Sequence, residues 1–394
     1  MNIGINGYEA VVPRFGFNKK TGLPNRVGSS EFCYQMLLSL FNLDKKNKYT
    51  IFLPVKPSAD LPKENENWKY EVVTSKKLWT MIGLSRKLLA YKNKIDVFFS
   101  PTHYLPLHIL EPSVISILDV SYLYFPNFFK KKDLYQLKVW GKYSIKKAKK
   151  IITISESSKN DIIKAYNVSD SKLKVIYPGL KFETQNTKSE TNSKFKMQNS
   201  KLLKKKFGIN GDYILFVGTL QPRKNIVRLV DAFSKLKTEN IDLKKDLDLV
   251  VVGKKGWQYE EILAAPEKFG VKECVKFLEN ISDEDLQSFY KNALCFCLPS
   301  LYEGFGLPIL EAMQHGCPVV TSNVSSLPEA GGDAALYCNP EDVEDIKNNL
   351  ESIIQNSELR EEMIKKGYEQ VKKFSWEKTA HKTLNVLEET GKKV

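Results

Sequence analysis

The sequence has few of the residues that build metal centres and disulfide frameworks. It contains six cysteines, at positions 33, 274, 295, 297, 317 and 338, and four histidines in 394 residues. No two cysteines stand in a Cys-x-x-Cys pair, a spacing typical of zinc and redox sites. We therefore expect buried, reduced thiols, no metal ion and no cofactor.

Long apolar runs are also absent. The longest ones, such as Ile95–Phe99 and Tyr213–Val217, have the length of a strand, whereas a bilayer-spanning helix needs about 20 apolar residues. Residues Met1–Asn6 lack the basic leader and apolar core of a secretion signal. These absences predict a cytoplasmic protein.

Acidic residues are outnumbered by basic ones, and the formal net charge is +14. This excess predicts an anionic partner: nucleic acid, anionic lipid or a phosphorylated substrate. Lysine clusters at 130–132, 146–150 and 204–206 do not choose among these partners, because such clusters are also common on solvated helix faces. With 42% hydrophobic and 27% charged residues, the chain has the composition of a globular protein.

The predicted elements follow the order strand, turn, helix, which favours the α/β class with parallel sheets. Strands are predicted at 1–6, 49–53, 95–100, 114–118, 150–154, 174–177, 213–217, 247–252, 275–277, 294–298 and 318–321. The polar residues 182–205 are predicted to be a linker or insert between a first domain at 1–181 and a second beginning at 206. We expect two doubly wound domains facing each other across a cleft, with ligands bound beyond the carboxyl ends of the strands.

A strand end followed by two cations is the first candidate site. The strand at 213–217 leads into Gly218 and Thr219, and the glycine permits a sharp turn. Arg223 and Lys224 follow just before a predicted helix, whose N-terminal N–H groups and dipole favour an anion. An arginine fork beside a lysine suits a diphosphate. An exposed basic turn remains the alternative interpretation of this segment alone.

The segment 302–316 is the second candidate site, because it follows a predicted strand. Gly304 and Gly306 keep side chains out of the loop, so its N–H groups can approach a ligand closely. Glu303 and Glu311 can both point into one cleft and accept hydrogen bonds from sugar hydroxyls. The alternative is that Glu311 neutralises the start of the following helix.

Together these segments resemble glycosyltransferase family 4, whose members have the GT-B fold of two Rossmann-like domains. The resemblance is carried by Gly-Thr-Leu-Gln-Pro-Arg-Lys-Asn at 218–225 and by Glu303 and Glu311, separated by seven residues. Further matching segments lie at 100–106, 116–121, 153–159, 277–286 and 374–377. The resemblance implies that residues 377–394 pack back on the first domain, so that the second domain ends at 376.

The resemblance also implies roles for individual residues. Arg223 and Lys224 would bind the donor diphosphate and stabilise the charge that develops on the leaving group. Glu303 would hold the transferred sugar, and Glu311 the ribose hydroxyls. Further donor-binding positions would be Gly28 facing the diphosphate, Gly218 and Thr219, Phe277, Leu278 and Ile281 around the base, and Gly304, Phe305, Gly306 and Leu307.

The reaction implied by the resemblance is a retaining, metal-independent transfer from a nucleotide sugar to a glycan or a lipid-linked acceptor. His103 and Asp119, each on a loop after a first-domain strand, are further candidates for chemistry or acceptor contact. A synthase-type enzyme or a sugar epimerase of the same fold is the alternative. A basic nucleic-acid-binding protein is disfavoured because no recognition module of that class is visible, so we expect no nucleic-acid partner.

Leu118 departs from the family pattern. Members often carry a histidine here, before the residue matching Asp119, and that histidine contacts the donor sugar near its 6-position. A leucine would leave a 6-hydroxyl unpaired at a cost of ~1–3 kcal/mol. One interpretation is a donor without that hydroxyl, a 6-deoxyhexose or a pentose. The other is that Leu118 only packs, with His103 supplying the polar contact.

Aromatic residues at 122–129 precede the lysines at 130–132 and 142–150. Such a surface could rest on anionic lipid headgroups at the inner face of the cytoplasmic membrane, or bind a lipid-linked pyrophosphate acceptor. The alternative is that the aromatic rings belong to the core and the lysines cover them.

Overall fold

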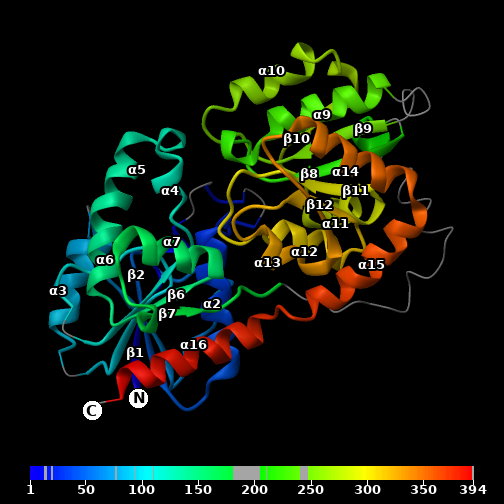
Figure 1. Ribbon diagram of the computed structural model, residues 1–394. Coiled ribbons are helices and arrows are strands. Elements are labelled where there is room, and N and C mark those ends of the chain that lie inside the picture. The colour runs from blue at the N-terminus through cyan, green and yellow to red at the C-terminus, as the bar shows by residue number, and fades with distance from the viewer. Residues whose placement is uncertain are drawn as a thin grey trace. The chain divides into compact units, whose positions relative to one another are not determined.

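The computed structural model divides into two compact α/β units (Figure 1). It describes residues 1–12, 16–18, 21–75, 78–92, 94–109, 111–180, 205–209, 211–239 and 247–392. The first unit comprises Met1–Gly179 and Phe374–Val394, and the second comprises Leu180–Lys373. Nearly all of the predicted linker, 182–204, lies outside the described residues.

The first unit is built on a seven-stranded sheet in the order β3-β2-β1-β4-β5-β6-β7, and every pairing is parallel. Its strands are β1 (Asn2–Asn6), β2 (Lys48–Leu53), β3 (Trp68–Val72), β4 (Val97–Ser100), β5 (Ser113–Ile117), β6 (Lys150–Thr153) and β7 (Leu173–Val175). The order reverses between β1 and β4. Loops after these strands therefore gather at the carboxyl edge of the sheet, where doubly wound folds bind ligands.

Helices connect most of these strands, as is usual for parallel pairing, and β2 leads to β3 without a helix. They are α1 (Tyr8–Val11), α2 (Ser29–Leu43), α3 (Leu84–Leu89), α4 (Ser121–Tyr124), α5 (Lys131–Gln136), α6 (Lys142–Lys147) and α7 (Glu156–Tyr166). The last helix, α16 (Trp376–Gly391), packs on α2 of this unit (Figure 1). The return is tight at Gly179, where a Cβ would lie 2.0 Å from the backbone nitrogen of Trp376.

The second unit contains a six-stranded parallel sheet in the order β10-β9-β8-β11-β12-β13. Its strands are β8 (Asp212–Val217), β9 (Leu247–Val252), β10 (Val275–Leu278), β11 (Cys295–Leu298), β12 (Val319–Ser322) and β13 (Ala335–Cys338). Its helices are α9 (Ile226–Glu239), α10 (Glu260–Lys268), α11 (Asp283–Asn292), α12 (Leu307–Gln314), α13 (Leu327–Gly331), α14 (Val343–Gln355) and α15 (Ser357–Val371). Two doubly wound parallel sheets confirm the predicted fold class.

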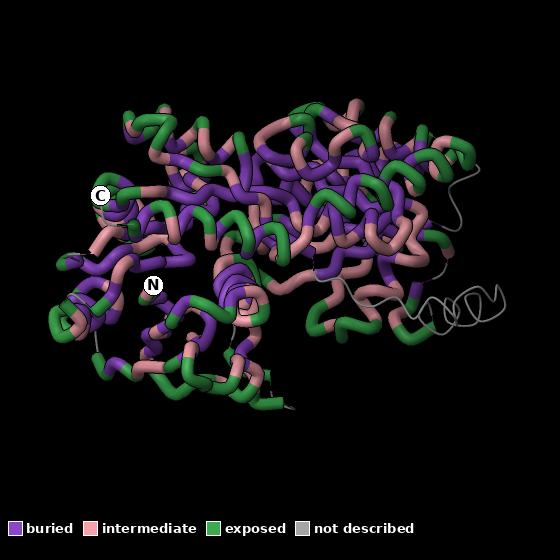
Figure 2. The backbone as a smooth tube through the Cα atoms, turned by 90° about the horizontal axis from the view of Figure 1, so that it is seen from below, coloured by how far each residue is buried: buried purple, intermediate pink, exposed green. Residues whose placement is uncertain are grey.

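Burial follows the layers of each unit. The central strands are buried along their length, whereas the outer turns of the helices are exposed (Figure 2). All six cysteines are free thiols. Cys33, Cys295, Cys297, Cys317 and Cys338 are buried as expected, whereas Cys274, just before β10, is only half-buried. In the part of the chain that the structure describes, no helix is long and apolar enough to cross a membrane.

Candidate functional site

The two predicted cations lie on a tight turn after β8. Gly218 O approaches the loop after β9 so closely that a Cβ on Gly253 would lie 1.8 Å from it. Beyond this turn the short 3-10 helix Pro222–Lys224 carries both cations. Asn225 follows with a left-handed φ of 60°, and α9 then begins at Ile226. The strand, turn and helix thus place Arg223 and Lys224 at the carboxyl edge of the second sheet.

These cations surround the carboxylate of Glu303, which comes from the loop after the neighbouring strand β11. Lys224 Nζ lies 2.5 Å from Glu303 Oε1, and Arg223 Nη1 lies 3.1 Å from Oε2. Arg223 also donates to the carbonyl of Tyr302, and Ser300 Oγ donates to Oε1 at 2.7 Å. All three charged side chains are nearly buried, with exposed fractions of 15% for Arg223 and 10% for Lys224 and Glu303.

The electrostatics of this cluster favour a bound anion. Burial alone would raise the pKa of Glu303, but the Lys224 ammonium and the Arg223 guanidinium lower it to about 2. The carboxylate is therefore ionised at neutral pH. Arg223 and Lys224 stand just before the N-terminus of α9, whose dipole adds to the attraction for an anion.

Two serines from the loop after β12 hold the backbone of Glu303. The Glu303 N–H donates to Ser325 Oγ at 3.0 Å, and Ser326 Oγ donates to the Glu303 carbonyl at 2.8 Å. Ser325 adopts a left-handed φ of 53° and Ser326 is fully buried. Sequence reasoning missed this pair, although a Ser-Ser dipeptide three residues after the end of a strand is the signal that could have indicated it.

Glu311 lies on α12 and contacts α11. The Tyr290 hydroxyl donates to Glu311 Oε2 at 2.9 Å, and the Tyr290 ring stacks on His315 with 5.6 Å between centroids. Burial and the nearby Glu311 carboxylate raise the pKa of Tyr290. The residue before α12 is Gly306, with a φ of 103°. Glu311 therefore has a buried tyrosine as a specific partner, a contact that a role at the helix start alone does not explain.

The remaining donor-binding candidates of the second unit lie at neighbouring loops. Phe277 and Leu278 end the edge strand β10 and are half-buried. Ile281, in the loop that follows, is also half-buried. The Leu278 carbonyl accepts from the Gly253 N–H at 2.9 Å, which joins this strand end to the loop after β9. The other candidates comprise the buried Gly304 and Phe305 and the half-buried Gly218, Thr219 and Leu307.

Gly28 precedes α2 in the first unit with a positive φ of 55°, and a Cβ there would meet no atom within 4 Å. Arg26 anchors this segment. It donates to the Ala10 carbonyl at 2.7 Å, pairs with Asp60, and lies 4.0 Å from the centre of the Tyr34 ring. Arg26 was not singled out from the sequence, and its buried guanidinium fixes the approach to Gly28.

His103 and Leu118 lie in the loops after the neighbouring strands β4 and β5. His103 is half-buried, with its ring edge-on to Tyr104 at 6.2 Å. The Leu118 side chain is only 9% exposed, and Ser158 Oγ donates to its carbonyl at 3.1 Å. This burial is what the packing interpretation of Leu118 requires.

Asp119 shapes the backbone after β5. Its Oδ1 accepts from the Ser121 N–H at 2.9 Å and from Ser121 Oγ at 2.7 Å. Both bonds stabilise the turn into α4, so the carboxylate has a structural task at this position.

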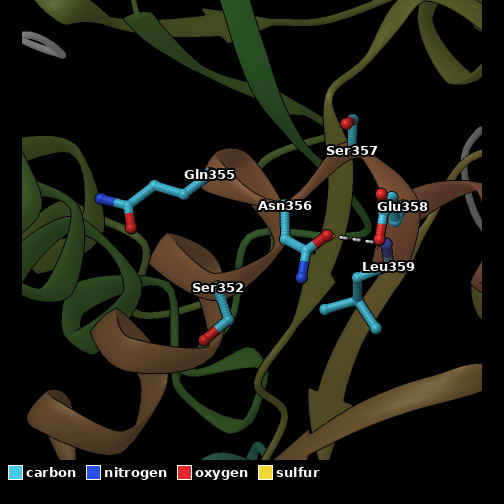
Figure 3. Close-up of a pocket in the computed structure, with 6 residues that line it drawn as sticks. All are labelled: Ser352, Gln355, Asn356, Ser357, Glu358 and Leu359. Carbon is cyan, nitrogen blue, oxygen red and sulfur yellow. Dashed lines mark hydrogen bonds between the residues drawn. The ribbon is translucent and has the colours of Figure 1, made fainter.

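A hollow of about 630 Å³ lies elsewhere, at the junction of α14 and α15 (Figure 3). Asn356 points its side chain at the Leu359 N–H, 2.9 Å away, and so caps α15. The residues that line the hollow are mostly exposed: Ser352, Gln355, Asn356, Ser357, Glu358 and Leu359. None of the predicted site residues lines this hollow, and we assign it no function.

The chain is similar in sequence to known glycosyltransferases. Residues 199–370 match the family described as glycosyl transferases group 1. O-antigen chain mannosyltransferase B from Escherichia coli is 35% identical over 294 residues, which cover 73% of this chain and 73% of that protein. O-antigen chain mannosyltransferase RfbU from Salmonella typhimurium is 27% identical over 307 residues, covering 77% and 76%. Serotype-specific mannosyltransferases from Escherichia coli are longer, and the chain spans 29–31% of their length.

A solved structure shows the same fold. The Anabaena protein Alr3699/HepE, determined in complex with UDP-glucose, superposes with a TM-score of 0.70 at 17% identity, covering 99% of this chain and 100% of that one. The resemblance to family 4 is compatible with the group 1 match. The chain therefore belongs to the glycosyl transferases group 1 family and is a glycosyltransferase of the GT-B fold.

Proposed function

We propose that the protein transfers a sugar from a nucleoside-diphosphate sugar to a glycan or a lipid-linked acceptor during assembly of a surface polysaccharide. The observation that carries this proposal is the buried cluster of Arg223, Lys224 and Glu303. It joins two cations suited to a diphosphate with a carboxylate suited to sugar hydroxyls. The O-antigen roles in the names of the two relatives support this class of product.

The proposed mechanism relies on positioning and electrostatics. Arg223 and Lys224 bind the diphosphate and stabilise the charge that accumulates on it as the glycosidic bond breaks. Glu303 holds the transferred sugar, and Glu311 holds the ribose. We expect retention of the anomeric configuration. We also expect that no metal ion is needed, since Arg223 and Lys224 would supply the positive charge for the diphosphate.

Two donor sugars have separate support. Mannose is favoured by the names of the two O-antigen relatives, both of which are mannosyltransferases. A 6-deoxyhexose or a pentose is favoured by Leu118, which offers no hydrogen bond to a 6-hydroxyl. We rank mannose first, because burial of the Leu118 side chain to 9% exposure fits a packing role.

The surface around α5 and α6 supports contact with an anionic membrane. Tyr135 is 65% exposed and Val139 43% exposed, and the exposed lysines Lys131, Lys138 and Lys142 flank them along the chain. Exposed apolar side chains among cations suit the interface of an anionic bilayer. This surface would hold the enzyme at the inner face of the cytoplasmic membrane, where a lipid-linked acceptor is available.

Flotation with vesicles tests the membrane proposal. The protein should float with vesicles containing anionic lipid, and binding should weaken with added salt. A Lys138→Ala/Lys142→Ala variant should float less. Lys365→Ala/Lys366→Ala, which removes two exposed lysines of α15, is the matched control and should behave as wild type. Salt-insensitive binding, or none at all, would contradict the proposal.

Thermal unfolding with nucleoside diphosphates and their sugars tests the catalytic proposal. A ligand that binds only the folded state raises the apparent stability by RT ln(1 + [L]/Kd), about 2.7 kcal/mol at 100 times Kd. The stabilisation should disappear in Arg223→Ala/Lys224→Ala and persist in Lys365→Ala/Lys366→Ala. If no nucleotide or nucleotide sugar stabilises the folded wild-type protein, the proposed donor site is wrong.

A further inference from the structure

Asn225 connects the cation-bearing turn to the ends of two other strands. Its side-chain Nδ2 donates to the Pro299 carbonyl at 2.9 Å and to the Pro340 carbonyl at 2.6 Å. Pro299 directly follows β11, and Pro340 lies two residues after β13. The two amide hydrogens thus join loops that are 74 and 115 residues away in the sequence.

The side-chain oxygen of Asn225 also has a hydrogen-bond partner. Asn225 Oδ1 accepts from Arg228 Nη1 at 3.0 Å, so both donors and the acceptor of the amide are occupied. The residue is only 5% exposed. Its φ of 60° is a left-handed conformation that asparagine tolerates better than most residues with a side chain. Glycine would adopt this backbone without supplying either bond, and aspartate would direct an oxygen at two carbonyls.

The Pro299 bond bears on the geometry of the ion cluster. Pro299 begins the loop that carries Ser300 and Glu303, while Asn225 ends the turn that carries Arg223 and Lys224. The same two segments are joined once more by the backbone bond from the Leu301 N–H to the Arg223 carbonyl, at 2.9 Å. The Asn225 amide is therefore a buried link between the segment with the cations and the segment with the carboxylate.

We propose that Asn225 is a positioning residue that sets the register of Arg223 and Lys224 against Glu303. Its link to Pro340 ties this register to the end of β13, so that three strand ends are held together around the cluster. The effect on donor binding rests on the proposed function, whereas the effect on Glu303 does not. A shift of about 1 Å in such a site can cost about 100-fold in rate.

The test compares Asn225→Gly with wild type by three measurements. The first is the titration of Glu303, followed by NMR of carboxyl-labelled glutamate and assigned with Glu303→Gln. In wild type the carboxylate should stay ionised from pH 7 to pH 4, because Lys224 and Arg223 hold its pKa at about 2. In Asn225→Gly the pKa of Glu303 should rise, so that part of its titration becomes visible between pH 7 and pH 4. The second and third measurements are the affinity for a nucleoside diphosphate, expected to fall at least tenfold, and thermal stability.

Tyr213→Phe is the matched control. It removes a buried hydrogen bond, from the Tyr213 hydroxyl to the Phe289 carbonyl at 2.8 Å, from the same unit. This control should lose stability without moving the Glu303 titration or the nucleotide affinity. Asn225→Ser, which removes both bonds to the carbonyls and adds no charge beside Glu303, is the second variant should Asn225→Gly not fold.

Each outcome decides the proposal. A raised Glu303 titration in a folded Asn225 variant, absent from Tyr213→Phe, supports positioning. An unchanged titration with unchanged affinity overturns it, as does failure of both Asn225 variants to fold while Tyr213→Phe folds, because Asn225 would then be a stability element. If wild type binds no nucleotide, the proposed function fails, and the titration alone decides the role of Asn225.

Discussion

Lys224 Nζ lies 2.5 Å from Glu303 Oε1, which pairs a cation of the loop after β8 with a carboxylate of the loop after β11. These two strands are neighbours in the sheet, at the position where its strand order reverses. A doubly wound sheet leaves a crevice there. The buried pair therefore lies where a fold of this kind presents its ligand-binding loops.

Replacement of Glu303 by glutamine should separate turnover from nucleotide binding. We expect Glu303→Gln to lose at least about 100-fold in kcat. It should bind a nucleoside diphosphate as well as wild type or better, because no carboxylate then competes for Lys224. Titration calorimetry with the diphosphate and a turnover assay measure the two effects. Near-normal turnover, or loss of nucleotide binding, would contradict the role given to Glu303.

The same residue should make stability depend on acid pH. The pKa of Glu303 lies at about 2 in the folded protein, below its ordinary 4.5. The ion pairs of Glu303 with Lys224 and Arg223 therefore stabilise the folded protein above about pH 4.5, by roughly 3 kcal/mol. This stabilisation is lost as the pH falls toward 2 and Glu303 becomes protonated. Glu303→Gln lacks it, so the difference in unfolding free energy between wild type and variant should shrink over that range. A difference that stays constant would count against the pairing.

The sequence predicted the central strands and missed two at the edges. Central strands such as β9, with all six residues buried, appear as continuous apolar runs. The edge strand β3 has no such run, because Lys69 and Glu71 interrupt it, whereas β13 is a run of only four apolar residues, Ala335–Cys338, that the prediction passed over. Edge position alone does not hide a strand, since the edge strands β7 and β10 were predicted.

The candidate site was predictable only in part. Arg223, Lys224 and Glu303 each follow a recognisable strand, and a common sheet edge brings such residues together. Ser325 from the next loop, which contacts Glu303, and Tyr290 from α11, which contacts Glu311, depend on which strands and helices pack side by side. That arrangement is fixed by long-range packing, so a local pattern such as the Ser-Ser dipeptide can mark a loop but not the residue that it contacts.

Tyr290→Phe should weaken donor binding with little change in kcat. The variant removes the hydroxyl that donates to Glu311 Oε2, so the carboxylate proposed to hold the ribose loses a fixed partner. A three- to tenfold rise in the KM for the donor is expected, about 1 kcal/mol. Tyr213→Phe, which loses a bond of similar length to a carbonyl, is the control and should leave KM unchanged. An equal rise in both variants would show a general loss of stability.

Gly253→Ala should disrupt the turn that leads to the cations. Its Cβ would lie 1.8 Å from Gly218 O, a distance that requires the backbone to move. We expect a loss of at least about 2 kcal/mol in unfolding free energy, together with weaker nucleotide binding. Gly141→Ala, where the Cβ would lie 3.5 Å from the Tyr122 hydroxyl in a helical segment, should be neutral or stabilising. Denaturant unfolding of both variants measures the contrast, and similar losses would reject the steric argument.

Leu118→His should change the preference among donor sugars if this position contacts the 6-substituent. The measurement is the ratio of kcat/KM for a hexose donor to that for its 6-deoxy analogue, with the same nucleotide. An imidazole N–H can pair with a 6-hydroxyl, so the ratio should rise about five- to tenfold, the equivalent of roughly 1 kcal/mol. Leu118→Met, similar in volume and apolar, should leave the ratio unchanged. An unchanged ratio in both variants would assign Leu118 to packing and leave donor choice to the second unit. A rise confined to the histidine variant would make Leu118 the residue that decides how the enzyme treats the 6-position.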